Sequence, residues 1–229
     1  MVERAKELEM SSLAITDHGA LYGVIEFFNT AKEAGIKPLI GMEAYLASRT
    51  MRDRDPEEDK KSSHLLLLAE NQTGYQNLLK IASAAQLDGF YYFPRIDRDF
   101  LAAHSEGLIA TSGCLSAEVP RSILKENLAE ARAKLDWYYQ VFGQDRFFLE
   151  LQHHEIPELH KVNKILQELG TRYQAQYVAT NDVHYVNRAD ARLQDILLCV
   201  QTGSLYTEPK RMRMSGDDFY LRSSAEMAS

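Results

Sequence analysis

Side chains that can bind metal ions recur where apolar runs of this sequence end. Asp17-His18 follows the apolar run 13–16, and Glu43 stands inside the apolar run 39–45. A carboxylate within a buried strand is costly unless it is paired or bound to a metal ion. These two places therefore indicate a polar site built on an otherwise apolar framework.

Four further donors occupy comparable positions. They are His64, Cys114, Asp182 and His184, of which His64 begins an apolar run and the others follow one. Strand side chains alternate between faces, so an Asp-x-His spacing places both groups on one side of an extended segment. Imidazole, carboxylate and thiolate ligands together suit zinc, manganese or iron rather than calcium or magnesium. Two or three such ions can clamp a phosphate ester and activate water, which makes phosphoester hydrolysis the expected chemistry.

Each donor alone also has a structural interpretation. Cys114 can be a small buried residue, and Cys199, within an apolar helix pattern, is assigned to the core. Glu150 can pair with a neighbouring lysine or arginine. Of the adjacent residues His153 and His154, one must point away from the other. The joint placement of the donors at successive strand ends, rather than any one of them, predicts a metal centre.

The elements that must position these residues alternate between strand and helix. Six buried strands are predicted near residues 13, 39, 65, 108, 147 and 178, and helices over 2–10, 22–34, 74–85, 118–124, 128–142, 158–173 and 188–200. This order predicts a parallel sheet covered by helices, either an open doubly wound sheet or an α/β barrel. A solvated loop is predicted over residues 49–63, and an aromatic loop over residues 89–94. No glycine-rich phosphate-binding motif follows a strand, which argues against a nucleotide-binding domain.

Length and composition are those of a globular domain. The 229 residues are 45% hydrophobic and 26% charged, with 26 Lys+Arg against 33 Asp+Glu and a net charge of −7. This balance argues against a domain that coats nucleic acid, but it leaves a metal-dependent nucleic-acid enzyme open. Two cysteines exclude a disulfide framework and suit the cytoplasm, and the apolar runs are too short to span a membrane.

Several segments resemble one protein family. They are 15–19 (ITDHG), 41–45 (GMEAY), 64–69 (HLLLLA), 77–78 (NL), 112–116 (SGCLS) and 179–185 (ATNDVHY). Together they resemble the PHP (polymerase and histidinol phosphatase) domain over essentially the whole chain. The segments 73–78 and 209–211 fit the version at the N-terminus of the bacterial DNA polymerase III α subunit. The resemblance implies a PHP-type distorted (β/α)₇ TIM-like barrel, with metal ions at the carboxyl ends of its strands.

The resemblance also implies a ligand set. The positions that match are His18, Glu43, His64, Cys114, Asp182 and His184, six of the nine in the family. By analogy, Glu43 bridges two ions, one of which His64 and Cys114 hold. Asp182 holds the other. The remaining ion is shared by His18 and His184. Up to three divalent ions are expected, zinc or manganese, or else iron.

Catalytic roles are implied for Glu43, Asp182 and His184, and Asp17 is expected to orient the site from behind the ligands.

The chain departs from the family pattern at its start. The family begins with a strand that carries an H-x-H pair and then an acidic ligand, and neither precedes the helix predicted over 2–10. We therefore expect the barrel to lack its first strand. Its open edge would invite pairing with another chain. The expected division is a PHP domain over 1–205 and a linker to a polymerase body over 206–229, including the basic cluster 210–213.

The resemblance implies a fragment of a DNA-directed DNA polymerase, a nucleotidyltransferase of DNA replication, whose PHP domain is a metal-dependent 3′–5′ exonuclease. The expected partners, through the full-length polymerase, are DNA and other replicative subunits. The incomplete ligand set predicts weak or absent activity for this chain alone. Two alternatives stay open. One is a non-catalytic module that braces the polymerase, with metal serving only folding; the other is a stand-alone phosphoesterase.

Overall fold

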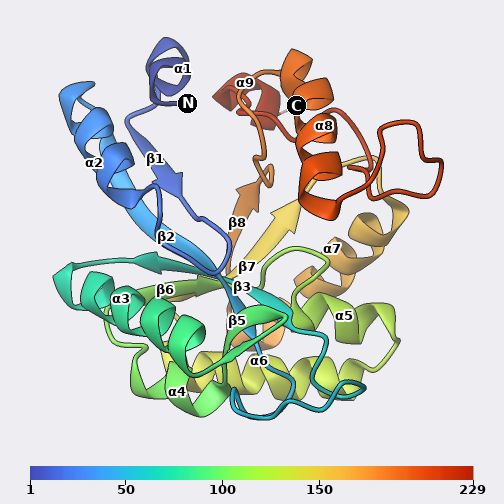
Figure 1. The fold of residues 1–229 in the computed structure, drawn as a ribbon. Helices are drawn as coiled ribbons and strands as arrows, with labels where there is room; N and C mark the ends of the chain where they lie inside the picture. The colour runs from blue at the N-terminus through green and yellow to red at the C-terminus, as the bar shows by residue number, and fades with distance from the viewer. Residues whose placement is uncertain (229) are drawn as a thin grey trace.

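A curled, mixed sheet forms the centre of the molecule, with helices packed on its outer surface (Figure 1). The computed structural model describes residues 1–228. The six predicted strands are confirmed as β1 (Ser12–Ile15), β2 (Lys37–Leu46), β3 (Ser63–Ala69), β6 (Leu108–Thr111), β7 (Phe147–Gln152) and β8 (Gln176–Thr180). A short hairpin, β4 (Phe90–Tyr91) and β5 (Phe93–Ile96), replaces the predicted aromatic loop. The strand order is β4-β5-β2-β3-β6-β7-β8. β1 is parallel to the first half of β2, and it lies along the same edge of β2 that pairs with β5 further on.

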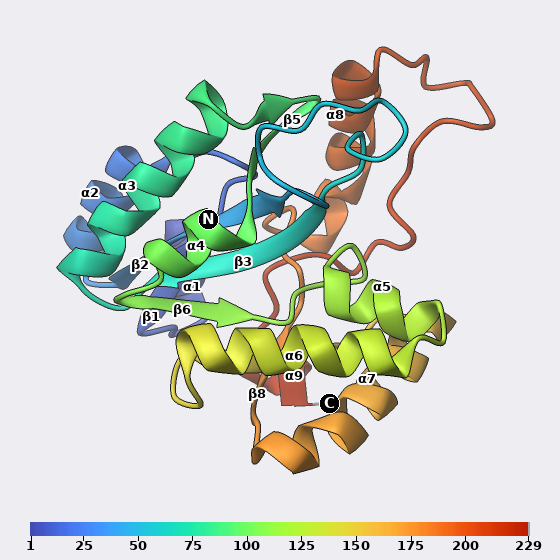
Figure 2. The same cartoon turned by 90° about the horizontal axis from the view of Figure 1, so that it is seen from below.

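The helices cover this sheet in two groups. They are α1 (Val2–Glu7), α2 (Val24–Glu33), α3 (Gln72–Leu87), α4 (Arg98–Ala103), α5 (Glu118–Leu124), α6 (Leu128–Phe142), α7 (Pro157–Gly170), α8 (Ala191–Thr202) and α9 (Ser224–Ala228), with 3₁₀ turns at Thr171–Tyr173 and Arg188–Asp190. Helix α3 packs on β3 and β5, whereas α6 packs on β6 and β7, with α5 and α7 beside it (Figure 2). All seven predicted helices are present. None in the described part of the chain is long and apolar enough to cross a membrane.

Local signals explain where the central helices begin. The side chain of Asn71 accepts a hydrogen bond from the Gly74 amide at the start of α3, and Asn127 does the same for Glu130 at the start of α6. Such caps satisfy amides that have no partner within the helix. Apolar residues on one face of each helix then join the core, where Leu67 of β3 is fully buried. The helices thereby hold the strands in fixed positions relative to one another.

The predicted parallel sheet is wrong at β3. This strand runs antiparallel to both β2 and β6, while the other pairings among the six main strands are parallel. The chain between β2 and β3 is the loop 47–62, and an antiparallel pair, here with Leu46 opposite Ser63, needs no crossover helix. His64 near the start of β3 therefore lies at the same end of the sheet as residues that follow the parallel strands.

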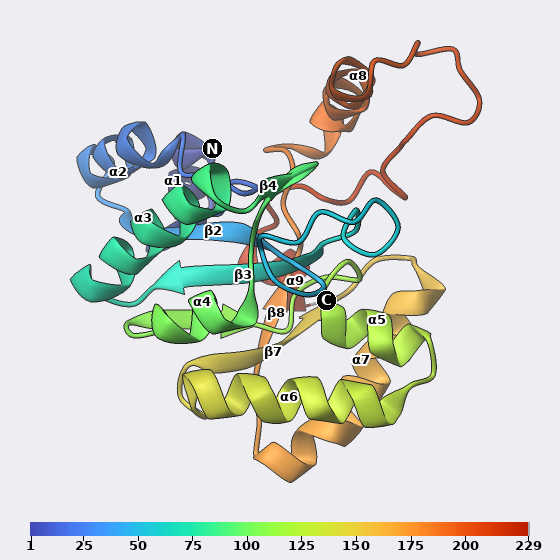
Figure 3. The same ribbon diagram turned by 60° about the horizontal axis from the view of Figure 1, so that its bottom comes forward.

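The sheet is curled but not closed. β8 ends it on one side and β1 lies at the other, and no strand pairing between residues 1 and 228 joins the two. This confirms the predicted barrel-like fold with an open side. Near that side, Leu221 packs against Val2, Leu13 and Phe27. Helix α8 and the loop after it project from the sheet (Figure 3). Association of two chains through the open edge stays a prediction.

The predicted loop over 49–63 is confirmed as a loop, but it is not solvated throughout. The carboxylate of Asp59 is fully buried and accepts hydrogen bonds from Arg49, Ser48 and the Asp55 amide. The hydrogen bonds from Arg49 hold the pKa of Asp59 well below its ordinary value. Part of this charged segment therefore pairs around one buried carboxylate, and a run of charged letters does not reveal such pairing.

Candidate metal centre

Glu43 lies at the centre of a cluster with two histidines. The backbone continues the β1–β2 ladder past His18, because the Glu43 amide donates to Asp17 O (3.1 Å) and the Gly19 amide donates to Glu43 O (2.9 Å). On the other side of β2, His64 of β3 hydrogen-bonds through Nδ1 to the Glu43 carboxylate. His18 Nε2 lies 3.8 Å from Glu43 Oε2. One ligand atom from each of His18, Glu43 and His64 lies within 4.8 Å of the others.

The charge of Glu43 is stabilised by these neighbours. Burial alone would raise the pKa of its carboxyl group, but the hydrogen bond from His64 and the charges of the surrounding histidines outweigh burial. The pKa therefore lies below the ordinary value, and the group is an anion at neutral pH. A half-buried carboxylate between two imidazoles is a donor set that zinc, manganese or iron can use.

Cys114 approaches the same cluster from the turn after β6. Its Sγ lies 3.9 Å from Nδ1 of His64. The turn needs Gly113, which has φ +71° and whose added Cβ would come within 2.8 Å of the Ala117 Cβ. Burial raises the pKa of the Cys114 thiol to about 12, and the charges of Asp182 and Glu43 add to this effect. Binding a metal ion would therefore displace a proton from the thiol.

Asp182 and His184 lie next to this cluster, after β8. His184 Nδ1 is 2.7 Å from the carbonyl oxygen of Asp182 and 3.8 Å from its Oδ1. The segment is not extended as predicted, because Asp182 has φ +47° in the left-handed region, which aspartate tolerates better than most residues. The ring centroids of His184 and His18 are 6.5 Å apart. Burial raises the pKa of Asp182, and Glu43 adds to the effect while His184 opposes it.

The structure thus brings four predicted donors together and places two beside them. Asp17 does not touch the other donors: its Oδ2 accepts the Gly23 amide (3.0 Å) and so anchors the loop before α2. Tyr45 was not predicted as a site residue, yet its hydroxyl lies 3.4 Å from His18 Nδ1. Alternation along β2 puts Tyr45 on the same face as Glu43, which is the sequence signal that identifies it.

Glu150 does not form the ion pair considered for it. Its buried carboxyl group instead accepts hydrogen bonds from Thr111 Oγ1 (2.5 Å), Thr180 Oγ1 (2.5 Å) and Gln152 Nε2 (2.9 Å). These are neutral donors from β6, β7 and β8, so they tie three strands together under the site. Burial raises the pKa of Glu150, although the three hydrogen bonds oppose this.

The variant Glu150→Gln is expected to change how stability depends on pH. A carboxyl group whose pKa is raised by folding contributes fully below its ordinary pKa, and the contribution is lost as pH rises through the raised value. The unaltered chain should therefore lose stability relative to Glu150→Gln as pH rises from about 4.5 towards neutrality. Urea unfolding at a series of pH values measures this, with Glu168→Gln on the exposed face of α7 as the control. Parallel curves for the unaltered chain and Glu150→Gln would contradict it.

The structure also resolves the pair His153 and His154. His153 is exposed, with its ring 5.7 Å from that of His160, whereas His154 is almost completely buried. The imidazole of His154 stacks on Phe219 at 4.1 Å and bonds through Nδ1 to Asp218 Oδ2 at 2.9 Å. The contact between His154 and Asp218 was not predicted from the sequence, because no local pattern connects residues 64 positions apart.

Comparison with known proteins decides the family. A family model described as the PHP domain matches residues 1–154. The chain belongs to the PHP domain family. It is 46% identical over 229 residues to the DNA polymerase III subunit alpha of Borreliella burgdorferi and 48% identical over 221 residues to that of Thermus aquaticus. The matches cover 99% and 96% of this PHP chain but only 20% and 18% of those proteins, so it spans about a fifth of their length.

A more distant likeness exists among solved structures. A structure from Bifidobacterium adolescentis, provisionally named a metal-dependent phosphoesterase, matches with a TM-score of 0.45 and 16% identity. The match covers 79% of the PHP chain and 80% of that chain. At this distance it bears on neither the site nor the activity.

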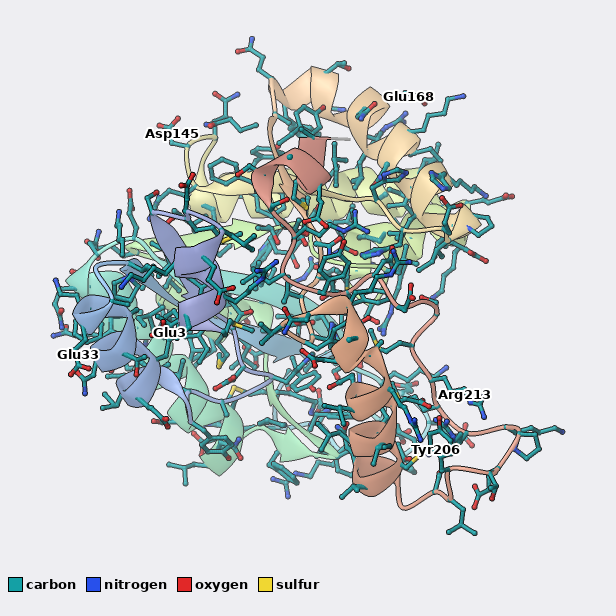
Figure 4. All side chains as sticks on the ribbon, turned by 90° about the horizontal axis from the view of Figure 1, so that it is seen from above. Glu3, Glu33, Asp145, Glu168, Tyr206 and Arg213 are labelled. Atoms are coloured by element: carbon teal, nitrogen blue, oxygen red, sulfur yellow. The ribbon has the colours of Figure 1, made fainter. Side chains whose placement is uncertain are left out.

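Only part of the segment after α8 extends away from the rest of the molecule. Tyr206 and Arg213 lie on the loop that extends away from the sheet (Figure 4). Within that loop, the Arg211 side chain is buried and forms two hydrogen bonds with Asp195 of α8 (2.5 Å each). The basic cluster 210–213 therefore contributes one of its charges to an internal ion pair. The division between domain and linker at residue 205 stays a prediction.

Proposed function

We propose that this PHP domain is part of a DNA polymerase III α subunit and holds a divalent metal centre that hydrolyses phosphodiester bonds at the 3′ end of DNA. One observation supports this above others: His18, Glu43 and His64 bring their ligand atoms within 4.8 Å of one another on three different strands or strand ends. The polymerase assignment is supported by relatives named DNA polymerase III subunit alpha.

The side chains of this cluster fit such a centre. Glu43 is anionic and lies between the two imidazoles, and Cys114 supplies a thiol beside His64. A sulfur ligand favours zinc or iron, whereas carboxylate and imidazole also accommodate manganese. We assign Asp182 and His184 to the same centre, as ligands of further ions. Up to three ions would then be held when the family's full ligand set is present.

The bound ions would supply Lewis acidity towards a phosphate oxygen and make water more acidic. The side chains of the protein would hold and transfer protons next to these ions. Burial raises the pKa of the Asp182 carboxyl group, and His184 lies within 3.8 Å of the same group, so these two side chains could exchange a proton with water or a leaving group at the site. Glu43 would keep its negative charge and fix the positions of the two imidazoles beside it.

Partners and location follow from the polymerase assignment. DNA would be the substrate, and other replicative subunits would bind the longer polypeptide of which this domain forms a part. The net charge of −7 gives the domain little general attraction for DNA. Local positive charge at bound metal ions would supply that attraction at the site itself. The two unpaired cysteines suit function in the cytoplasm.

Metal content tests the centre. Elemental mass spectrometry on the dialysed chain should find about one or more zinc, manganese or iron ions per chain. The double variant His64→Ala/Cys114→Ala should lose at least one of them. The matched control is His104→Ala/Cys199→Ala, which removes one histidine and the other cysteine away from the site. Equal metal content in the two double variants would reject the assignment.

Activity distinguishes the proposed function from its alternatives. The metal-loaded chain, extended at its N-terminus by a strand that carries the family's H-x-H pair, is incubated with 5′-labelled single-stranded DNA and separately with small phosphate monoesters. Shortening from the 3′ end supports the exonuclease. Bound metal without cleavage of either substrate favours a structural module that braces the polymerase. Phosphate release from the monoesters alone favours a stand-alone phosphoesterase.

A further inference from the structure

His154 and Asp182 leave neighbouring strands at the same level. β7 and β8 are parallel, and their last paired residues are Gln152 and Thr180. His154 and Asp182 each follow two positions later. Their side chains therefore emerge at the same end of the sheet, at the edge where the metal centre lies.

The imidazole of His154 has one nitrogen in use and one without a partner. Nδ1 bonds to Asp218 Oδ2 at 2.9 Å. Nε2 is buried and hydrogen-bonds to no residue in the described part of the chain. Leaving a buried polar atom without a partner is unfavourable. If Nδ1 carries the proton that Asp218 accepts, Nε2 presents a lone pair, which is the arrangement of a metal-binding histidine backed by a carboxylate.

Asp218 is held in place by the same loop that carries Asp182. Asn181 Nδ2 donates to the carbonyl oxygens of Asp218 (2.7 Å) and Tyr220 (2.8 Å). The backbone amide of His184 donates to Phe219 O at 2.9 Å. The Phe219 ring stacks on His154 at 4.1 Å and lies 5.9 Å from the ring of His184. The segment around Asp218 is thus fastened to the Asp182 loop, and this fixes the orientation of the His154 ring.

We propose that His154 is a further metal ligand, which binds through Nε2 an ion shared with Asp182, and that Asp218 is its positioning residue. This inference rests on the proposed metal centre and adds to it a donor from the end of β7. A purely structural histidine at this place leaves Nε2 unsatisfied. A cavity of about 310 Å³ is lined in part by His154, Asn181, Asp218 and Arg222.

Cobalt binding tests this ligand without an activity assay. The dialysed chain is titrated with Co²⁺ and followed by visible absorption, with elemental mass spectrometry for stoichiometry. We expect His154→Gln to bind about one ion fewer, or that ion at least 10-fold more weakly, with altered absorption bands. Asp218→Asn keeps the imidazole and should weaken the same ion about 10- to 100-fold. The matched control is His153→Gln, which changes the exposed neighbour and should bind like the unaltered chain.

The outcomes separate this inference from the proposed function. If His154→Gln and Asp218→Asn bind Co²⁺ like the unaltered chain while His64→Ala/Cys114→Ala loses it, the metal centre stands and His154 is not a ligand. If the unaltered chain binds no Co²⁺, both proposals fail. Circular dichroism checks folding of each variant. Should His154→Gln not fold, the affinity of Asp218→Asn decides.

Discussion

Glu43→Gln is expected to weaken metal binding by more than about 100-fold, because replacing even a residue behind a metal ligand costs about 10- to 100-fold. Glutamine has nearly the same shape but no negative charge. The two imidazoles, which now surround a carboxylate, would surround a neutral amide instead. The attraction for a divalent ion at the centre of the cluster would be lost, and with it any hydrolysis that depends on the ion.

Calorimetric titration with Zn²⁺ or Mn²⁺ measures this effect, and DNA cleavage by the metal-loaded protein provides a second readout. Glu33→Gln is the matched control, since Glu33 is exposed and is the last residue of α2 (Figure 4). A lowered pKa shows that Glu43 is ionised at neutral pH without metal, so the comparison at pH 7 is between a charged and a neutral group. Unchanged affinity in Glu43→Gln would mean that Glu43 is not a metal ligand.

Arg95→Met is expected to destabilise the protein by about 3–5 kcal/mol, the loss typical of breaking a buried charged network. The Arg95 guanidinium is completely buried. It donates to the carbonyl oxygens of Gly89 (3.1 Å), Asp59 (2.9 Å), Met51 (3.3 Å) and Asp53 (2.8 Å), and it lies over the ring of Tyr91. Methionine fills similar volume but leaves these carbonyl groups without donors.

These hydrogen bonds connect β5 to the loop between β2 and β3. Losing them should free the loop that closes the antiparallel pair carrying Glu43 and His64. Thermal unfolding measures the loss, and for a chain of this length it corresponds to a fall in Tm of about 10 °C. The control is Arg172→Met, because Arg172 forms an exposed ion pair with Asp136 at 3.9 Å, worth at most about 1 kcal/mol, and lies over the ring of Tyr173. Equal melting of both variants would contradict a structural role for Arg95.

Local patterns in the sequence were sufficient for most elements of the fold. The bounds predicted for α5 and α6 agree with the structure, because apolar periodicity is a local property of each segment and Asn127 caps the start of α6. The hairpin over Phe90–Ile96 was missed because its strands are only two and four residues long. Helix α4, with six residues, was also missed. Short elements depend on neighbours for their stability, and those neighbours are distant in sequence.

The sequence by itself determined which residue types stand at the strand ends, and therefore the chemistry available there. It also determined the alternation of strands and helices, because the periods of 2 and 3.6 residues are local properties of the chain. The tertiary structure alone decided the direction of β3, which places His64 beside Glu43. It likewise decided the pairing of His154 with Asp218. Both depend on how a long segment closes back on the sheet, and that is governed by packing between residues far apart in the chain.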